Sequence, residues 1–282
     1  MERKRIAIVG VGLIGGSLAL QLHEKKISSK LIGVESNEFH GQKALELELV
    51  DEILPLEEAI SQSDVVILAI PVDSMLALLP ELLNKITSQV VIDLGSTKAQ
   101  LIEAVNDHPK RGRYVAAHPM WGTEYNGPQA AVKGAFENTA VIICNAKDSD
   151  ADALQWTKNM FSKVGMHLLE MEAKAHDLHA AYVSHISHIT SFALANTVLE
   201  KEREEDAIFE LASAGFSSTV RLAKSNPAMW VPIFKQNREN VLDVLNEHIA
   251  QLGKFKSCLE KENYEYLLEL IENANKIRKI LK

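Results

Sequence analysis

The sequence has little of what marks several large classes of protein. Only two of its 282 residues are cysteines, Cys144 and Cys258, and they lie far apart without the spacing of a zinc site. A disulfide framework is therefore not expected, and a reduced, cytoplasmic setting fits best. Neither an internal repeat nor a low-complexity tract is visible. These absences leave an ordinary globular chain, long enough for two domains.

An excess of positive charge is also lacking. Lys and Arg number 30 against 38 Asp and Glu, a formal net charge of −8, and neither half of the chain is basic. A nucleic-acid partner is therefore not expected. The first residues combine a basic head with an apolar run, as a signal peptide does. That run holds a glycine motif with a better explanation, and no stretch is long enough to span a bilayer, so no membrane partner is expected.

The glycine motif is "GVGLIGGS". It places Gly10, Gly12 and Gly15 in G-x-G-x-x-G spacing, directly after the apolar strand pattern 5–9 and before a helical pattern. The first glycine makes a tight turn, the second admits a pyrophosphate, and the third lets helix and strand pack closely. We expect these glycines, with Leu13 and Ile14 between them, to bind a dinucleotide.

A carboxylate in the right place strengthens this prediction. The next strand pattern, 30–35, ends in Glu35, 20 residues after Gly15. A carboxylate there accepts hydrogen bonds from ribose hydroxyls and repels a 2′-phosphate, which favours NAD over NADP. Pro71, at the end of the apolar strand pattern 64–71, is also expected to contact the cofactor. The alternative, a glycine-rich turn that binds no nucleotide, is less favoured in this context.

Strand and helix patterns then alternate. The apolar runs 64–71 and 90–95 are typical of strands covered on both faces, and a helical pattern, 72–83, separates them. Further strand patterns follow at 114–120, 138–144 and 166–171. The alternation predicts an α/β fold, with a Rossmann-like, doubly wound parallel sheet over residues 1–171.

Polar residues follow two of these strands. Ser96 and Lys98 come after the run that ends at Gly95, and His118 lies in the next strand pattern. Ligands of such sheets bind at the carboxyl ends of the strands. Ser96 and His118 could therefore meet at the nicotinamide.

From residue 172 onward the strand patterns stop. Residues 172–202 have long helical periodicity, contain neither Gly nor Pro and are apolar nearly all round in the middle, so we predict one long helix there. Residues 262–281 form an amphipathic helical pattern. Pro227 and Pro232 flank the start of another helix. We predict an all-α domain over 172–282. Its apolar surface predicts a homodimer formed through this domain.

Four histidines lie close together in "HDLHAAYVSHISH". At about 100° per residue they point in different directions, and His176 and His188 are about 18 Å apart along a helix axis, so no metal site is expected. His185 and His188 share a face, about 60° apart. Either could bind an anionic substrate or move a proton, or could instead be a structural core histidine. His176 and His179 are interpreted as structural or capping residues.

Five blocks occur in one order along the chain: "GVGLIGGS", "DLGSTK", "HPMWGTE", "HDLHAAYVSHISH" and "TVRLAKSNPAMW". Together they resemble the prephenate dehydrogenase family, which includes arogenate dehydrogenases, from residue 6 to about 240. The resemblance implies oxidative decarboxylation of prephenate by NAD to 4-hydroxyphenylpyruvate, in tyrosine biosynthesis. Arogenate, with an amine in place of the side-chain ketone, remains an alternative substrate.

The resemblance also implies roles for single residues. His118 matches the catalytic histidine that takes the proton of the ring hydroxyl, and Ser96 matches a serine that hydrogen-bonds it. His188 and Arg221 match positions that bind the substrate's carboxylate and keto oxygens. These assignments agree with chemistry, because histidine is a base near neutral pH and arginine can bind a carboxylate with two parallel hydrogen bonds.

The remaining matches and the departures concern the pocket. Glu124 and Trp230 match residues at the pocket entrance and wall. Ser217 and Ser218 stand where many members carry a Lys-Asp pair, so a charged gate built on that pair is absent. Ser187 stands where proline is common, and because it keeps a backbone N–H we expect a straighter helix.

Two other functions are weighed against this one. A 3-hydroxyacid dehydrogenase also joins a nucleotide domain to a helical one, but it needs a lysine within a glycine-containing motif on the long helix, and residues 175–200 hold neither. A non-catalytic NAD sensor would be expected to lack the base or the anion site. The presence of Ser96, His118, His188 and Arg221 speaks against it.

Overall fold

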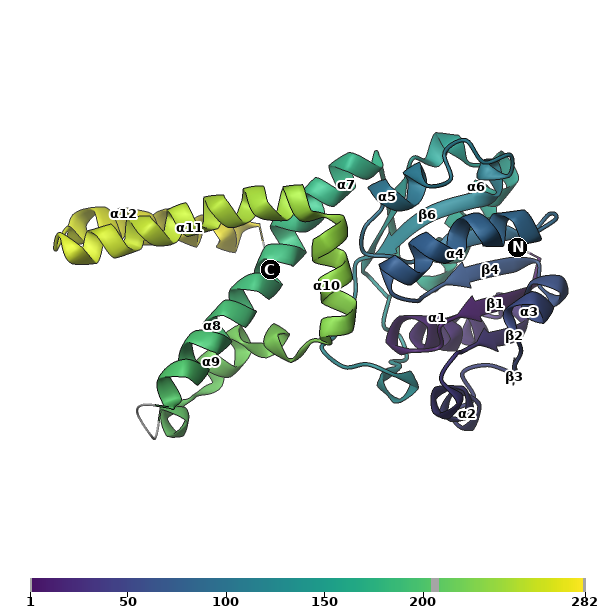
Figure 1. The fold of residues 1–282 in the computed structure, drawn as a ribbon, viewed down its shortest axis with the longest axis horizontal. Helices are drawn as coiled ribbons and strands as arrows, with labels where there is room; N and C mark the ends of the chain where they lie inside the picture. Colours follow the sequence, from purple (N-terminus) through teal and green to yellow (C-terminus); the bar gives the residue numbers. More distant parts are fainter. Residues whose placement is uncertain (1, 204–207, 281–282) are drawn as a thin grey trace. The chain divides into compact units, whose positions relative to one another are not determined.

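The computed structural model describes residues 2–203 and 208–280, and one eight-stranded sheet dominates it (Figure 1). The strand order is β3-β2-β1-β4-β5-β6-β7-β8. The strands are β1 (Lys4–Val9), β2 (Ser28–Val34), β3 (Glu52–Ile53), β4 (Val65–Leu68), β5 (Val90–Asp93), β6 (Tyr114–Pro119), β7 (Ala140–Cys144) and β8 (His167–Met171). All strands predicted from the sequence are present, and the order reverses between β1 and β4, where such sheets bind ligands.

Helices connect most of the strands and also follow the last one. The α-helices before β8 are α1 (Leu13–Glu24), α2 (Glu38–Glu46), α3 (Leu56–Gln62), α4 (Val72–Lys85), α5 (Ala99–Glu103) and α6 (Ala151–Val164). Those after it are α7 (Ala173–Ala180), α8 (Ile186–Glu202), α9 (Ala214–Thr219), α10 (Pro227–Gln236), α11 (Arg238–Glu260) and α12 (Tyr264–Ala274). The Rossmann-like sheet followed by a helical region confirms the predicted fold class.

One strand departs from the predicted parallel arrangement. β7 pairs antiparallel with β6, with His118 opposite Ile142, while the other pairings are parallel. Among the residues between them, 120–139, the only helix is a short 3-10 turn at Pro128–Ala130. Because a parallel neighbour needs a crossover of a dozen or more residues, usually helical, a strand reached by this loop returns in the opposite direction.

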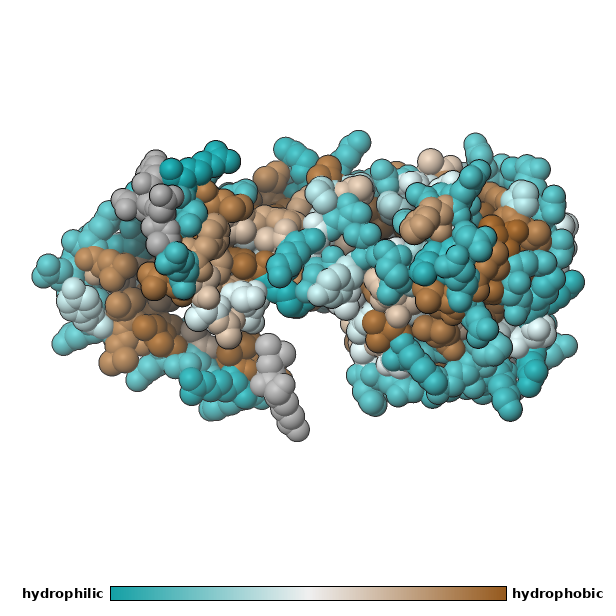
Figure 2. All heavy atoms as spheres, turned by 90° about the horizontal axis from the view of Figure 1, so that it is seen from below, coloured by the Kyte–Doolittle hydropathy of each residue, from teal (hydrophilic) through white to brown (hydrophobic). Residues whose placement is uncertain are grey.

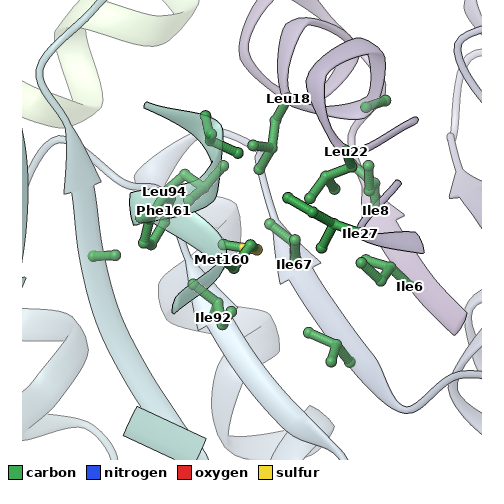
Figure 3. Packing of buried hydrophobic residues seen from close by; sticks show 14 of the residues in the cluster. Ile6, Ile8, Leu18, Leu22, Ile27, Ile67, Ile92, Leu94, Met160 and Phe161 are labelled. Carbon is green, nitrogen blue, oxygen red and sulfur yellow. The ribbon is translucent and has the colours of Figure 1, made fainter. Parts of the chain in front are cut away.

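The core lies on both faces of the sheet, because consecutive strand residues point to opposite sides. Ile6 and Ile8 pack on one side with Leu18 and Leu22 of α1 and Phe161 of α6 (Figure 3). The residues between them, such as Ala7 and Val9, pack on the other side against α3, α4 and α5. This two-sided burial explains why the strands are continuous apolar runs.

The predicted long helix over 172–202 is confirmed, with an irregularity in its middle. α7 passes into α8 through a π-helical segment, Ala181–His185. The helix continues through Ser187, as its backbone N–H allows. The segment just before it is a wider π-helical turn, so the helix is not regular throughout. No sequence pattern indicated this π segment.

Chain contacts divide the protein into two compact units, residues 1–237 and 238–282. The second unit consists of α11 and α12 with a 3-10 turn, Asn275–Lys279. Hydrophobic side chains are exposed along the helices (Figure 2). In the second unit they include Ile249, Leu252, Leu259, Tyr264 and Leu268. No helix within 2–203 or 208–280 is both long and apolar enough to cross a membrane.

The glycine turn makes a prediction about stability. A Cβ on Gly15 would lie 2.0 Å from the carbonyl oxygen of Gly10, whereas a Cβ on Gly12 would meet nothing within 4 Å. Gly15→Ala should therefore separate α1 from β1 and lower the free energy of unfolding by about 3 kcal/mol. Gly12→Ala is the matched control and should leave it unchanged. Urea denaturation of the three proteins measures this, and equal stability of the two variants would contradict the close packing.

Candidate active site

The glycine turn has the geometry of a dinucleotide cradle. Gly10 has φ of +90°, and a side chain there would meet the carbonyl oxygen of Ala69 on the neighbouring strand end. The open space above Gly12 allows a phosphate to approach the backbone at the N-terminus of α1. Glu35 lies beside this turn, where its carboxylate accepts hydrogen bonds from the N–H groups of Val11 and Asn37, both 3.2 Å. The residues present therefore fit a dinucleotide with free ribose hydroxyls.

A cavity of about 340 Å³ opens at this edge of the sheet. It lies among the loops that follow β1, β4 and β5, the loop after β6, and α10. Six residues singled out from the sequence line it: Gly12, Leu13, Ile14, Pro71, Ser96 and Glu124. The tertiary fold thus brings four of the predicted cofactor residues and two predicted substrate-side residues to one cavity. His118, His188 and Arg221 are not among the residues that line it.

His118 is buried near the carboxyl end of β6, with 9% of its surface exposed. Its Nδ1 lies 2.8 Å from Nε2 of His176, and Nδ1 of His176 lies 2.8 Å from Oδ1 of Asp177. The sequence resemblance pairs His118 with Ser96, but the ring bond that the structure shows goes to His176. Of the two interpretations of His176, structural or capping, this placement favours the structural one, because His176 is buried with both ring nitrogens bonded and the N-cap of α7 is Glu172.

Asp177 connects His176 and His118 to the segment that follows β5. Its Oδ1 accepts a hydrogen bond from the backbone N–H of Lys98 (2.8 Å) and its Oδ2 one from Ala99 (2.9 Å). Asp177 was not among the residues predicted from the sequence. The sequence did offer a hint: Asp177 follows His176 near the start of a helix predicted to be buried, and a buried carboxylate needs hydrogen-bond donors.

A second buried network lies beneath His118. The ammonium of Lys98 pairs with the carboxylate of Asp93 and donates to the carbonyl oxygen of Ala117 at 2.8 Å. Tyr114 donates its hydroxyl to the other oxygen of Asp93, at 2.6 Å. Lys98 and Asp93 are fully buried, so each needs the other to offset the cost of leaving water. In the sequence, Lys98 was noted only because it follows a predicted strand, and neither Asp93 nor Tyr114 was predicted to be a site residue.

Burial also sets the charge of His118. Loss of solvent contact, and then the neighbouring His176, Lys98 and His185, lower its pKa well below the usual 6.5. The imidazole is therefore neutral at pH 7 and able to accept a proton. A base in a dehydrogenase needs this state.

Both later histidines contact Trp230, as their shared helix face predicts. The ring of His188 stacks on the indole, with centroids 3.4 Å apart and an interplanar angle of 27°. His185 meets it edge-on at 5.9 Å and is almost fully buried. The side chain of Asn237 donates to Nδ1 of His185 (3.1 Å) and to the carbonyl oxygen of Asp177 (2.6 Å). His185 is thus a satisfied core residue in this structure.

One ring nitrogen of His188 bonds to the backbone. Its Nδ1–H donates to the carbonyl oxygen of Ser184 at 3.1 Å, which leaves Nε2 as the second ring position. Burial lowers the pKa of His188, the bond to Ser184 raises it, and the nearby cation of Arg221 lowers it further. His188 thus has the indole of Trp230 stacked on its ring and the cation of Arg221 near enough to lower its pKa.

Arg221 and Glu124, both selected from the sequence, form an ion pair. Nη1 of Arg221 lies 2.7 Å from Oε2 of Glu124, with the arginine side chain half exposed and the glutamate mostly covered. Ser217 and Ser218 lie exposed on α9 and bring no charge to this pair. Within the described part of the chain, no group of three or more His, Cys, Asp or Glu side chains is arranged to hold a metal ion.

The fold and this site define a class of protein. The chain has a Rossmann-like sheet, a glycine cradle with an acidic partner, and a neutral buried histidine at the carboxyl edge of the same sheet. These features are those of an NAD-dependent oxidoreductase. Family models agree with it. Residues 18–170 match the prephenate dehydrogenase nucleotide-binding domain, and residues 172–273 match the prephenate dehydrogenase dimerization domain. This chain belongs to the prephenate dehydrogenase family.

Individual relatives cover nearly the whole chain. The prephenate dehydrogenase of Bacillus subtilis is 30% identical over 97% of this chain and 75% of its own length. A cyclohexadienyl dehydrogenase of Zymomonas mobilis is 30% identical over 99% and 96%. Among solved structures, prephenate dehydrogenase from Aquifex aeolicus with hydroxyphenyl propionate and NAD+ has a TM-score of 0.88 at 29% identity, over 100% of this chain and 99% of that one. Synechocystis arogenate dehydrogenase has a TM-score of 0.76 at 25% identity, over 99% and 100%.

The burial of His185 predicts a pH-dependent stability. Burial lowers its pKa to about 4, so below pH 6.5 the unfolded chain binds this proton and the folded chain does not. The free energy of unfolding should fall between pH 6.5 and pH 4, by about 3 kcal/mol from this group. Urea denaturation across this range should show a shallower fall for His185→Gln. Parallel curves for the two proteins would exclude His185 as the cause.

Proposed function

We propose that this chain catalyses the NAD-dependent oxidative decarboxylation of prephenate to 4-hydroxyphenylpyruvate. The observation that carries the proposal is the neutral, buried imidazole of His118 near the carboxyl end of β6, at the same edge of the sheet as the glycine cradle. Bound NAD would accept the hydride from the ring carbon that carries the hydroxyl group. Gly10, Gly12 and Gly15 would hold its pyrophosphate side, and Glu35 its ribose hydroxyls.

His118 is assigned the role of general base. As the hydride leaves, the hydroxyl proton passes to the ring of His118, and loss of the ring carboxylate as carbon dioxide makes the ring aromatic. Ser96 lines the cavity at the same edge of the sheet, and we assign it to the substrate hydroxyl and to His118. Since aromatisation supplies much of the driving force, the protein has mainly to orient the base, the hydride donor and the anions.

Arg221 and His188 are assigned to the anionic part of the substrate. Arg221 already binds one carboxylate, that of Glu124, so a substrate carboxylate would compete with Glu124 for the same guanidinium. Trp230 would form the wall that holds His188 in place.

Arogenate is the second candidate substrate. A solved arogenate dehydrogenase shares the fold over 99% of this chain. Arogenate offers the same ring hydroxyl and the same two carboxylates to His118 and Arg221. It differs only at the side-chain amine.

We also propose separate roles for the two parts of the chain, and a homodimer. Residues 1–171 would bind NAD, and residues 172–282 would bind substrate and form a homodimer in the cytoplasm. The family description of the second part as a dimerization domain supports the dimer, and so do the exposed apolar residues of α11 and α12.

The direct test offers prephenate and arogenate in parallel to purified protein with NAD, with NADP as the control, and follows NADH absorbance. We expect turnover with prephenate and NAD, because His118 is neutral and Glu35 disfavours a 2′-phosphate. Turnover with arogenate alone would keep the mechanism and change the substrate. No turnover with either would overturn the proposed function.

His118→Ala should lower kcat by about 100-fold or more while changing the dissociation constant of NAD little, because it removes a base rather than a binding group. His179→Ala, on the exposed side of α7, is the matched histidine control and should behave like the parent protein. Steady-state kinetics and cofactor titration separate the two effects. A His118→Ala protein with near-normal kcat would remove His118 from the mechanism.

Arg221→Ala should raise KM for the substrate by about tenfold or more with a smaller effect on kcat, because it removes a cation that binds the substrate anion. Arg5→Ala is a fair control, since Arg5 also forms an ion pair with a half-exposed side chain, to Asp64 at 3.3 Å, but lies near the amino end of β1, at the edge of the sheet opposite the cavity. An unchanged KM in Arg221→Ala would count against the anion role.

A further inference from the structure

We propose that His176 and Asp177 are positioning residues that hold His118 in one tautomer, with the proton on Nδ1 and a bare Nε2. This inference rests on the proposed function, in which His118 is the base. A base needs a lone pair directed at the substrate, and an imidazole has two nitrogens that could carry the proton. The hydrogen-bond partner of the other nitrogen decides which one does.

Three side chains, Asp177, His176 and His118, are joined in series by hydrogen bonds, and the carboxylate of Asp177 sets the donor direction of the whole series. Asp177 accepts two backbone hydrogen bonds, from Lys98 at 2.8 Å and Ala99 at 2.9 Å, and its side chain is almost fully buried. Backbone N–H groups only donate, so both oxygens of Asp177 act as hydrogen-bond acceptors here. The 2.8 Å contact between Oδ1 and Nδ1 of His176 therefore has His176 as its donor.

The same logic passes to His118. With its proton on Nδ1, a neutral His176 has a lone pair on Nε2, and this atom lies 2.8 Å from Nδ1 of His118. Nδ1 of His118 must then carry a proton, which it donates to His176. Nε2 of His118 is left without a proton, in the state a general base requires. Burial, which lowers the pKa of His118, keeps the ring neutral at pH 7.

Lys98 fixes the distances between the residues of this hydrogen-bonded series. Its backbone N–H holds Asp177 on α7, and its ammonium holds the carbonyl oxygen of Ala117, the residue before His118. One buried residue thus ties both ends of the His118–His176 pair. When His118 takes up a proton at Nε2, the positive ring donates more strongly through Nδ1. The carboxylate of Asp177 stabilises that charge through His176 without a second proton transfer.

A spectroscopic test reads the tautomer without any turnover. Protein labelled with 15N in its histidines, with His118 assigned by comparison with His118→Asn, should show His118 as the Nδ1–H form at pH 7.5. A proton on Nε2 of His118 in the parent protein would overturn the proposal. Because no substrate is needed, this result is separate from success or failure of the activity assay.

Substitutions at His176 test the consequence for catalysis. His176→Leu removes the acceptor, so His118 should lose its tautomer preference in the 15N spectrum, and kcat should fall by about 100-fold. NAD affinity should stay unchanged. His176→Gln can place an amide oxygen near the position of Nε2, so it should restore the Nδ1–H signal and bring kcat to within about tenfold of the parent.

His179→Leu is the matched control, three residues further along α7 and exposed. It should change neither the spectrum nor kcat. If His176→Leu keeps both the parent tautomer and the parent kcat, then His118 is held by something else and the proposal is wrong. If His176→Leu and His176→Gln lose kcat equally and both keep the parent tautomer, the role of His176 is structural packing, which also overturns it.

Discussion

The active-site region depends on one buried ion pair, between the ammonium of Lys98 and the carboxylate of Asp93. Two charges withdrawn from water each cost several kcal/mol, and they persist only where the geometry and further hydrogen bonds offset that cost. Here the carbonyl oxygen of Ala117 and the hydroxyl of Tyr114 complete the network. The pair therefore fixes the ends of β5 and β6 relative to each other, at the place where the chemistry is proposed.

This constraint extends to the helical half of the compact unit formed by residues 1–237. The backbone of Lys98 and Ala99 holds the carboxylate of Asp177, which begins the line of contacts to His176 and His118. Asn237 adds a second tie, because its side-chain amide donates to both Asp177 and His185. The four clustered histidines thus differ in their surroundings: His176 bonds to His118, His185 is a core residue, His188 stacks on Trp230, and His179 is exposed.

The sequence predicted the features that depend on residues close together in the chain, and missed those that depend on distant residues. The glycine spacing and Glu35 are close in sequence and obey local backbone rules, so the residue pattern alone predicts the cradle. The shared face of His185 and His188 followed from helical periodicity. The antiparallel return of β7 was missed because it depends on what the loop 120–139 lacks, a crossover helix. The π segment Ala181–His185 was missed because it has no composition of its own.

The sequence by itself determined the order of strands and helices, the two-sided burial of the sheet, the glycine cradle and the candidates His118 and Arg221. The elements, the burial and the cradle follow from periodicity and backbone sterics, whereas Arg221, and the catalytic role of His118, follow from the resemblance of contiguous sequence blocks to a known family. Only the tertiary structure decided that His118 bonds to His176, 58 residues away, and that Arg221 pairs with Glu124, 97 residues away. Such contacts depend on where packed elements bring polar atoms within about 3 Å, and no local pattern carries that information.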